Sequence, residues 1–568
     1  MAMTETTVDV LVLGSGAAGL AGALHAALLG QSVLIIEKSP VWGGSAAMSA
    51  GVLWVPNHAK MAEVSIADSD DDAMTYLRTI TAARIDEERL RAFLDGSRRM
   101  VALFERETPV QFAPVKEYPD YNTDVAGAKA GGRVLEPLPC DGAALGDDFA
   151  TLHNCYPGEL IFDRFMMRVD EARSLLLPGI APKLGMLMGM MRYICRARAR
   201  RVFNGRDPYL TMGQALTARL MMALRERGVP LRLESPAQSL LIEDRRVVGV
   251  RLASGERVRA RGGVLVATGG FERNESLRQR YQRHPVSATW TVGHVGNTGD
   301  GLALAEQAGA AIDAELMREA WWAPAVVPPG EPTAWVLVIE KSLPHGIFVD
   351  RSGRRFLNEA ANYTDVGAAF YEADAKTGKA VPAWLVFDAR FRKKFPIGPV
   401  KPGMMQPDRK LPDLLRPDRG WLHKADSIEA LAASIDVPPD ALAATIRRFN
   451  EFARRGEDAD FGRGRTLNDL HYADPTVKPN ASLGTLEKAP FYAVPVVPGD
   501  LGTKSGLVTD PAGRVLNANQ MPIRGLYAAG NVTSSVMGRS YPGAGGTLAP
   551  AMTFAFLAAE AIHEDARR

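Results

Sequence analysis

The chain opens with a short hydrophobic segment, VDVLVL at residues 8–13, in which polar positions are almost absent. A run this short and this rich in Val and Leu predicts a strand that is buried on both faces. The glycine-rich GSGAAG follows, and residues 20–29 then carry Ala and Leu at helical density. A second apolar run, residues 33–36, ends in Glu37. The pattern therefore predicts a strand, a tight turn, a helix and a second strand.

The spacing of this unit is that of a dinucleotide-binding fingerprint. Gly14 allows the turn, Gly16 lets a pyrophosphate approach main-chain N–H groups, and Gly19 lets the helix pack closely on the strand. An acid in the position of Glu37 accepts hydrogen bonds from an adenosine ribose. The residues predicted to contact this half of the cofactor are Gly14, Gly16, Ala17, Ala18, Gly19, Glu37 and Lys38.

Two later apolar runs, residues 264–268 and 525–529, also end in small residues. With the first strand they predict one sheet whose carboxyl edges face a single ligand. Residues 43–51 are again small, which lets the main chain follow a long cofactor and favours FAD over NAD. We expect non-covalent FAD, because no His-based tether is evident. The further predicted contacts are Gly44, Ser45, Ser49, Ala50, Gly51, Ala237, Thr268, Gly269, Gly530, Asn531 and Leu548.

Between these strands lie two more apolar runs, residues 231–235 and 247–252, separated by the polar residues 243–246. They predict an antiparallel ribbon, which we expect beside the adenine end of the cofactor.

The chain changes character near Met317, where the adjacent Trp321 and Trp322 offer an apolar wall. Residues 438–455 predict a helix, and an apolar run at 492–497 leads back towards the sheet. We therefore predict an α/β fold in which a Rossmann-like FAD-binding domain is interrupted by an inserted α+β catalytic (capping) domain. The predicted boundaries are residues 1–315 with 493–568 for the first domain and 316–492 for the second.

Composition excludes several classes of protein. The 568 residues carry a net charge of +2, and no segment-wide basic excess indicates a nucleic-acid partner. The three cysteines, Cys140, Cys155 and Cys195, show neither a CxxC pair nor metal-type spacing, so we expect no metal and no disulfide framework. The first residues lack the features of a secretory signal, and we expect a cytoplasmic protein.

Residues 175–201 are unusual, because a Met-rich apolar stretch is followed by five arginines. Pro178 and Pro182 interrupt the stretch, which falls short of the roughly 20 apolar residues of a spanning helix. Such a segment is typical of an interfacial membrane anchor, with apolar side chains in the acyl boundary and cations on headgroups. A core helix with a solvated basic end explains it equally well, and both interpretations stay open.

Near the C-terminus, the stretch VMGRSYPGAGGTLAPAM precedes an apolar helix that we expect over residues 551–562. We expect Thr547 to cap this helix. The helix N-terminus would then present N–H groups and partial positive charge to the pyrimidine edge of a flavin.

Several of these motifs together resemble those of 3-ketosteroid Δ1-dehydrogenases, FAD enzymes of the wider superfamily that includes fumarate reductases. They are GSGAAG, GGSAAMSAGVLWVPN, the YPDY near residue 120, AWW, RRFLNEAANY, GDLGTKSGL and the C-terminal stretch. Ser505 and Ala50 depart from the family pattern, where glycine is usual. The length and the segment at 175–201 are similar to those of the membrane-attached members that accept cholest-4-en-3-one.

The resemblance implies roles for particular residues. Tyr541 and the Gly545 N–H would hold the C3 oxygen of a 3-oxosteroid, and Tyr363 would take the C2 proton while C1 loses a hydride to flavin N5. Tyr121 would assist Tyr363, with Tyr118 as a rival for this role. A quinone is a plausible electron acceptor. The alternatives are a fumarate reductase-like flavoprotein, a 3-oxosteroid dehydrogenase acting at C4–C5, and a non-catalytic electron-relay subunit.

Overall fold

The computed structural model describes the chain except residues 1–4, 83–85, 162–164, 167, 169–207 and 568. The segment at 175–201, the candidate membrane anchor, therefore lies outside the described residues. Within the described part of the chain, no helix has both the length and the apolar character needed to cross a bilayer.

The first hydrophobic run forms β1 (Glu5–Leu13), at the centre of an eight-stranded sheet. Its side chains alternate between two cores: Val10 and Val12 pack on one face of the sheet, and Leu11 and Leu13 pack on the other. β1 pairs in parallel with β2 (Val33–Ile36) on one side and β13 (Arg257–Val266) on the other. β21 (Pro522–Ala528) pairs in parallel with β13. The three strands that the sequence predicted to share a sheet thus lie side by side, with β13 between β1 and β21.

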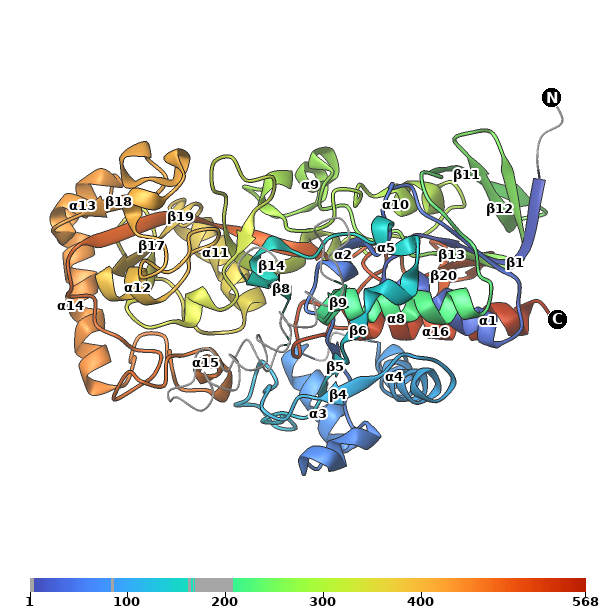
Figure 1. The fold of residues 1–568 in the computed structure, drawn as a ribbon, viewed down its shortest axis with the longest axis horizontal. Helices are drawn as coiled ribbons and strands as arrows, with labels where there is room; N and C mark the ends of the chain where they lie inside the picture. Colours follow the sequence, from blue (N-terminus) through green and yellow to red (C-terminus); the bar gives the residue numbers. More distant parts are fainter. Residues whose placement is uncertain (1–4, 83–85, 162–164, 167, 169–207, 568) are drawn as a thin grey trace.

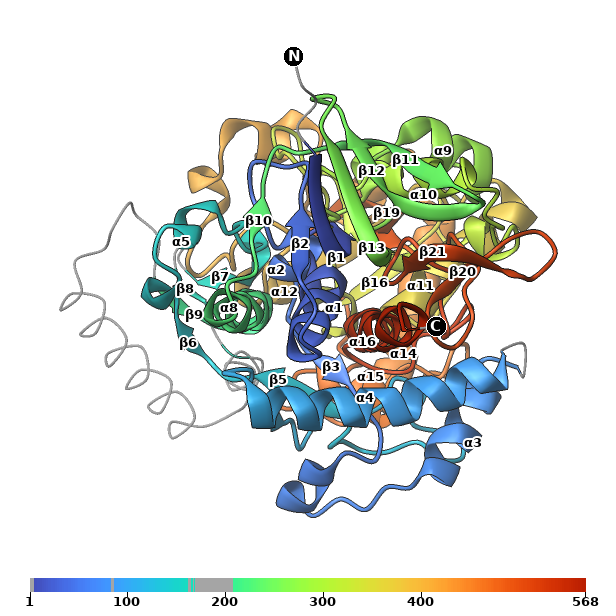
Figure 2. The same ribbon diagram turned by 90° about the vertical axis from the view of Figure 1, so that its right-hand side faces the viewer.

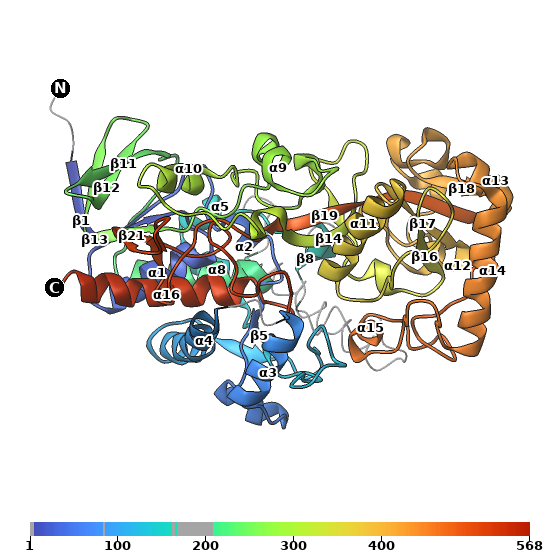
Figure 3. The ribbon, with the colours of Figure 1, turned by 180° about the vertical axis from the view of Figure 1, so that it is seen from behind.

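Helices cover one face of this sheet. α1 (Ala17–Leu28) packs between α16 (Leu548–Asp565) and α8 (Met212–Glu226), and α4 (Glu87–Glu107) lies against α16. Figure 2 shows α4 running across the molecule beneath α1 and α16, and Figure 3 shows it end-on below α16. The opposite face packs on a second core that includes α10 (Asp300–Glu306).

The sequence predicted an antiparallel ribbon of residues 231–235 and 247–252, and the first of these two strands is wrong. Residues 231–232 form β10, which pairs in parallel with β2, and the antiparallel partner of β12 (Arg246–Leu252) is β11 (Ala237–Glu243). The two-residue turn of Asp244 and Arg245 explains the difference, since both residues have positive φ. Such a turn fixes a tight hairpin and selects the residues directly before it as the partner strand.

A second sheet forms the other half of the molecule (Figure 1). Its long strand β19 (Phe491–Thr503) pairs with β14 (Ala320–Val326), β17 (Ala383–Asp388) and β18 (His423–Ala425). β15 (Trp335–Val336) and β16 (Gly346–Val349) complete the sheet. α14 (Pro439–Arg455) packs at its outer end beside α13 (Ile428–Ser434). The predicted domain boundary at 492/493 falls inside β19, which runs from this outer end towards the middle of the molecule (Figure 1).

Candidate active site

A cavity of about 580 Å³ lies between the two sheets. The cofactor-binding residues that the sequence predicted all line this cavity except Gly19, and so do Tyr121, Tyr363, Tyr541 and Gly545. Gly19 lies behind the cavity wall, where a Cβ would overlap the Gly14 carbonyl. It therefore permits the close contact of helix and turn, which is the role that the spacing predicted for it.

The nucleotide end of the cavity is built mostly from main chain. Gly14 has φ +103°, a conformation that side-chain-bearing residues rarely adopt. A Cβ at Gly16 would meet no protein atom within 4 Å, so this glycine faces open space at the start of α1. Glu37 is held at the edge of the cavity by the Ser15 N–H at 3.0 Å and the Ser39 N–H at 2.9 Å.

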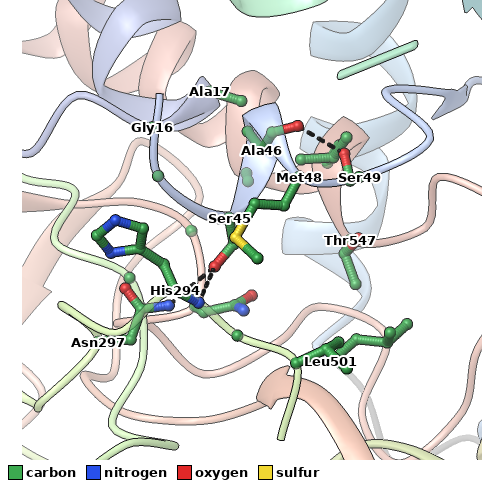
Figure 4. A pocket seen from close by; sticks show the side chains of 18 of the residues that line it. Gly16, Ala17, Ser45, Ala46, Met48, Ser49, His294, Asn297, Leu501 and Thr547 are labelled. Atoms are coloured by element: carbon green, nitrogen blue, oxygen red, sulfur yellow. Dashed lines mark hydrogen bonds between the residues drawn. The ribbon is translucent and has the colours of Figure 1, made fainter. Parts of the chain in front are cut away.

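The predicted contact Ser45 belongs to a polar cluster on the same wall whose other members, His294 and Asn297, sequence reasoning missed (Figure 4). The His294 N–H and the Asn297 side-chain amide each donate to the Ser45 hydroxyl at 3.0 Å. The Asn297 amide also donates to Glu272, a fully buried acid whose pKa is raised to about 7 by burial. The glycine-rich segment around residues 293–301 was the sole sequence signal for this wall.

The cavity fits FAD on two independent observations. The buried Nε2 of His294 has no hydrogen-bond partner among the described residues, as expected where a polar ligand completes the site. The glycine cradle at Gly14 and Gly16 leaves room for a pyrophosphate at a helix N-terminus. Glu37 and the walls around Ser45 and Gly530 are placed to hold the remainder of the cofactor.

Three tyrosines from distant segments meet at the other end of the cavity. The ring centroids of Tyr121, Tyr363 and Tyr541 lie 5.2–5.4 Å apart, each pair edge to face. The Tyr121 hydroxyl donates to the Tyr363 oxygen at 3.3 Å. Tyr118 instead shares a hydrogen bond with Tyr472. Tyr121 is therefore the tyrosine in direct contact with Tyr363, and Tyr118 lies one step further away.

Burial governs the acidity of these phenols. It raises the pKa of Tyr363 well above 10, an effect that the hydrogen bond from Tyr121 opposes. Burial also raises the pKa of Tyr541, and hydrogen bonds from Tyr363, Thr547 and the Gly545 N–H oppose that rise. The Gly545 N–H and the Tyr541 oxygen are therefore neighbours at this end of the cavity.

Gly545 is constrained by the main chain around it. It has φ +91°, and a Cβ there would overlap the Val52 carbonyl oxygen and the Trp54 nitrogen. α16 begins at Leu548, earlier than the sequence predicted, because Pro550 falls in the first turn where no N–H is required. Thr547 occupies the N-cap position, but its side chain makes no capping hydrogen bond.

The adjacent tryptophans have different surroundings. The Trp321 ring lies 4.9 Å from the Tyr541 ring and donates to Asn531 at 3.3 Å, so it supports one of the cavity tyrosines. Trp322 packs on Tyr371 and donates to Glu319. The predicted apolar wall near the site is thus supplied by Trp321.

The two-sheet fold and the glycine-lined cavity define a flavoprotein of the Rossmann-like type. The family described as FAD binding domain matches residues 9–548. A 3-oxosteroid 1-dehydrogenase of Mycolicibacterium smegmatis is 41% identical over 98% of this chain and 97% of its own length. A 4-oxocyclohexanecarboxylate 2-dehydrogenase of Sinomonas cyclohexanicum is 36% identical over 98% of this chain and 93% of its own.

Among solved structures, the chain resembles 3-ketosteroid Δ1-dehydrogenase from Sterolibacterium denitrificans in complex with 1,4-androstadiene-3,17-dione. The two are 42% identical, with a TM-score of 0.94, over 99% of this chain and 100% of the other. The chain therefore belongs to the 3-oxosteroid 1-dehydrogenase family of FAD-binding proteins.

Proposed function

We propose that this protein catalyses the FAD-dependent Δ1-dehydrogenation of 3-oxosteroids, converting a 3-oxo-4-ene to a 3-oxo-1,4-diene. The observation that carries the proposal is the meeting of Tyr121, Tyr363, Tyr541 and the Gly545 N–H at one end of a cavity whose other end fits FAD. Family membership supports the same reaction.

In the proposed reaction, the Tyr541 hydroxyl and the Gly545 N–H donate to the C3 carbonyl oxygen. They stabilise the enolate that forms when the C2–H bond breaks, and one donor of this kind typically contributes about 2.7–4 kcal/mol. The Tyr363 oxygen takes the proton from C2, and Tyr121, which donates to that oxygen, stabilises its phenolate form. FAD, when bound, supplies the acceptor for the hydride that leaves C1.

Anaerobic mixing of the holoprotein with a panel of ketones tests the proposal. Androst-4-ene-3,17-dione and cholest-4-en-3-one should bleach the flavin and yield the 1,4-diene. Fumarate should not reoxidise the reduced flavin, because the described cavity presents phenols where a dicarboxylate would require cationic clamps. Including 4-oxocyclohexanecarboxylate separates steroids from the smaller cyclic ketone named for the Sinomonas relative. Bleaching by that compound alone would refute the steroid assignment.

The proposal extends to steroids that keep a side chain, such as cholest-4-en-3-one, and to attachment at a membrane surface through residues 175–201. The Met-rich sequence of that segment and its arginines support both points. A membrane location would make a quinone the electron acceptor.

Deletion of residues 175–201 should move the protein from the membrane fraction to the supernatant. Recovery of the intact protein in the supernatant without detergent contradicts attachment, and clear preference for androst-4-ene-3,17-dione contradicts the side-chain assignment.

A further inference from the structure

Two lysines are buried behind the tyrosine cluster. Lys341 is 4% exposed and Lys504 is 1% exposed, and neither forms an ion pair within 4 Å among the described residues. Burial lowers the pKa of each to about 7. A buried ammonium group is unfavourable unless it is well bonded, and such lysines are rare. Their partners therefore matter.

Lys504 bonds to the chain directly before Tyr541. Its Nζ donates to the Ser540 carbonyl at 2.7 Å. The same ammonium group lies 4.1 Å from the centre of the Trp321 ring, and that ring packs on Tyr541. Lys504 thus fixes Tyr541 in two ways, through the main chain at its neighbour and through the face of the ring that supports it.

Lys341 bonds to the chain directly before Tyr363. Its Nζ donates to the carbonyls of Glu359 and Ala360 at 3.3 and 3.4 Å, and to the carbonyl of Ala361. These carbonyls lead into α11 (Tyr363–Thr377), whose first residue is Tyr363. The lysine therefore holds together the main chain of residues 359–361, just before the helix that starts with Tyr363.

The two lysines also share an acid. The charge of Asp365, in the first turn of α11, opposes the fall in pKa of both Lys341 and Lys504. The side chain of Asn362, the N-cap of α11, donates to the Asp365 carboxylate and accepts from the Asp365 N–H. The acid whose charge acts on both lysines is thus fixed at the start of the helix that carries Tyr363.

We propose that Lys341 and Lys504 are positioning residues, each holding the main chain before one of the two tyrosines that act on the ketone. The inference rests on the proposed dehydrogenation and adds to it the reason why two segments distant in sequence deliver their phenols to the same point. It also gives a role to the lysine of GDLGTKSGL, since Lys504 itself does not line the cavity.

Lys504→Met and Lys341→Met test the role, with Lys60→Met as the matched control. Lys60 also donates to a main-chain carbonyl, that of Phe112, but lies in a different part of the molecule. Both test variants should retain bound FAD and lose about tenfold or more in kcat with a smaller change in KM, because small displacements of reacting groups are costly. The Lys60 variant should turn over at the wild-type rate.

Exchange of the steroid C2 hydrogens with deuterated solvent separates the two lysines. Lys341→Met should slow this exchange about tenfold, because Tyr363 takes that proton. Lys504→Met should slow the exchange as well, because Tyr541 stabilises the enolate, and should in addition weaken binding of the 3-oxosteroid by a smaller factor, measured by equilibrium dialysis, because Tyr541 holds the ketone. A uniform loss in both measurements for both variants contradicts separate positioning roles.

Chemical rescue distinguishes the loss of the ammonium group from a loss of the fold. Propylammonium should restore turnover to Lys504→Ala and Lys341→Ala, whereas propanol of the same shape should not. Equal rescue by the alcohol, or wild-type kcat in both Met variants, overturns the positioning role while leaving the dehydrogenation intact. A wild-type holoprotein that leaves every 3-oxosteroid unchanged overturns both.

Discussion

The two ends of the cavity are built on opposite principles. The nucleotide part of the cofactor end uses main-chain atoms of residues close in sequence, chiefly 14–18 and 44–51, where small residues leave the main chain accessible. The substrate end uses phenol side chains from positions 121, 363 and 541, which the fold brings within 5.4 Å of one another. Glycine spacing therefore encodes the first end locally, whereas the second exists only once both sheets have assembled.

The two ends also differ in the physical property that controls their function. At the cofactor end, shape decides which ligand enters, and removal of a glycine changes that shape. At the substrate end, burial raises the pKa of each phenol, and the rise is opposed by a hydrogen bond from Tyr121 at Tyr363 and from Tyr363 at Tyr541. The following predictions test whether binding and catalysis are really divided in this way.

The largest expected effect is the loss of one phenol. Tyr541→Phe or Tyr363→Phe should keep FAD bound and lower steroid turnover at least ~100-fold, from the usual size of oxyanion and acid–base contributions. Tyr371→Phe is the matched control, since the buried Tyr371 hydroxyl has no hydrogen-bond partner among the described residues. Steady-state kinetics measure steroid turnover, and the flavin spectrum measures bound FAD. Wild-type turnover in both test variants would exclude both phenols from the catalytic step.

The pH dependence should follow the Tyr363 phenol. Because burial raises its pKa well above 10, the fraction present as phenolate at neutral pH is small and grows with pH. We expect kcat/KM to rise by up to about tenfold per pH unit between about pH 7 and 9. FAD affinity should change much less over that range. A flat kcat/KM profile in the wild type would falsify Tyr363 as the base.

Substitution of two glycines at the cofactor end should distinguish an effect on folding stability from an effect on FAD binding. Gly16→Ala places its methyl group in open space, so it should leave the unfolding free energy of the apoprotein unchanged and weaken FAD binding about tenfold. Gly14→Ala requires positive φ and overlaps the Ala267 carbonyl, so it should lower that free energy by at least about 2 kcal/mol. Denaturant titration measures the unfolding free energy, and FAD titration measures the affinity for FAD. Equal destabilisation in the two variants contradicts the assignment of Gly16 to the ligand.

The smallest effect is expected for Glu37→Gln. The amide keeps one acceptor but loses the charge that strengthens hydrogen bonds to hydroxyl groups, worth about 1 kcal/mol or roughly fivefold in FAD affinity. Turnover per bound FAD should remain that of the wild type, because Glu37 lies at the nucleotide end. A fall in turnover at saturating FAD would show that the two ends are coupled.

Much of the fold was predictable because its signals are local. The apolar run of β1, the glycine spacing before α1 and the acid after β2 each follow from neighbouring residues, and the structure has these elements in that order. The ribbon partner was mispredicted because a short turn, Asp244 and Arg245, outweighed the apolar run at 231–235. The start of α16 was misplaced because Pro550 was taken as a boundary, although a first turn tolerates it.

By itself, the sequence determined that a cofactor with a pyrophosphate binds at the N-terminal turn, because main-chain geometry is set by residues adjacent in the chain. Only the tertiary structure decided which tyrosine touches Tyr363, that His294 and Asn297 join the cofactor wall, and that Lys341 and Lys504 stand behind the phenols. The contacts of Tyr121 with Tyr363 and of Ser45 with His294 join residues 242 and 249 positions apart, and the lysine contacts join residues 18 and 36 positions apart. Burial and distance, which govern both hydrogen bonding and pKa, arise only when such segments pack together.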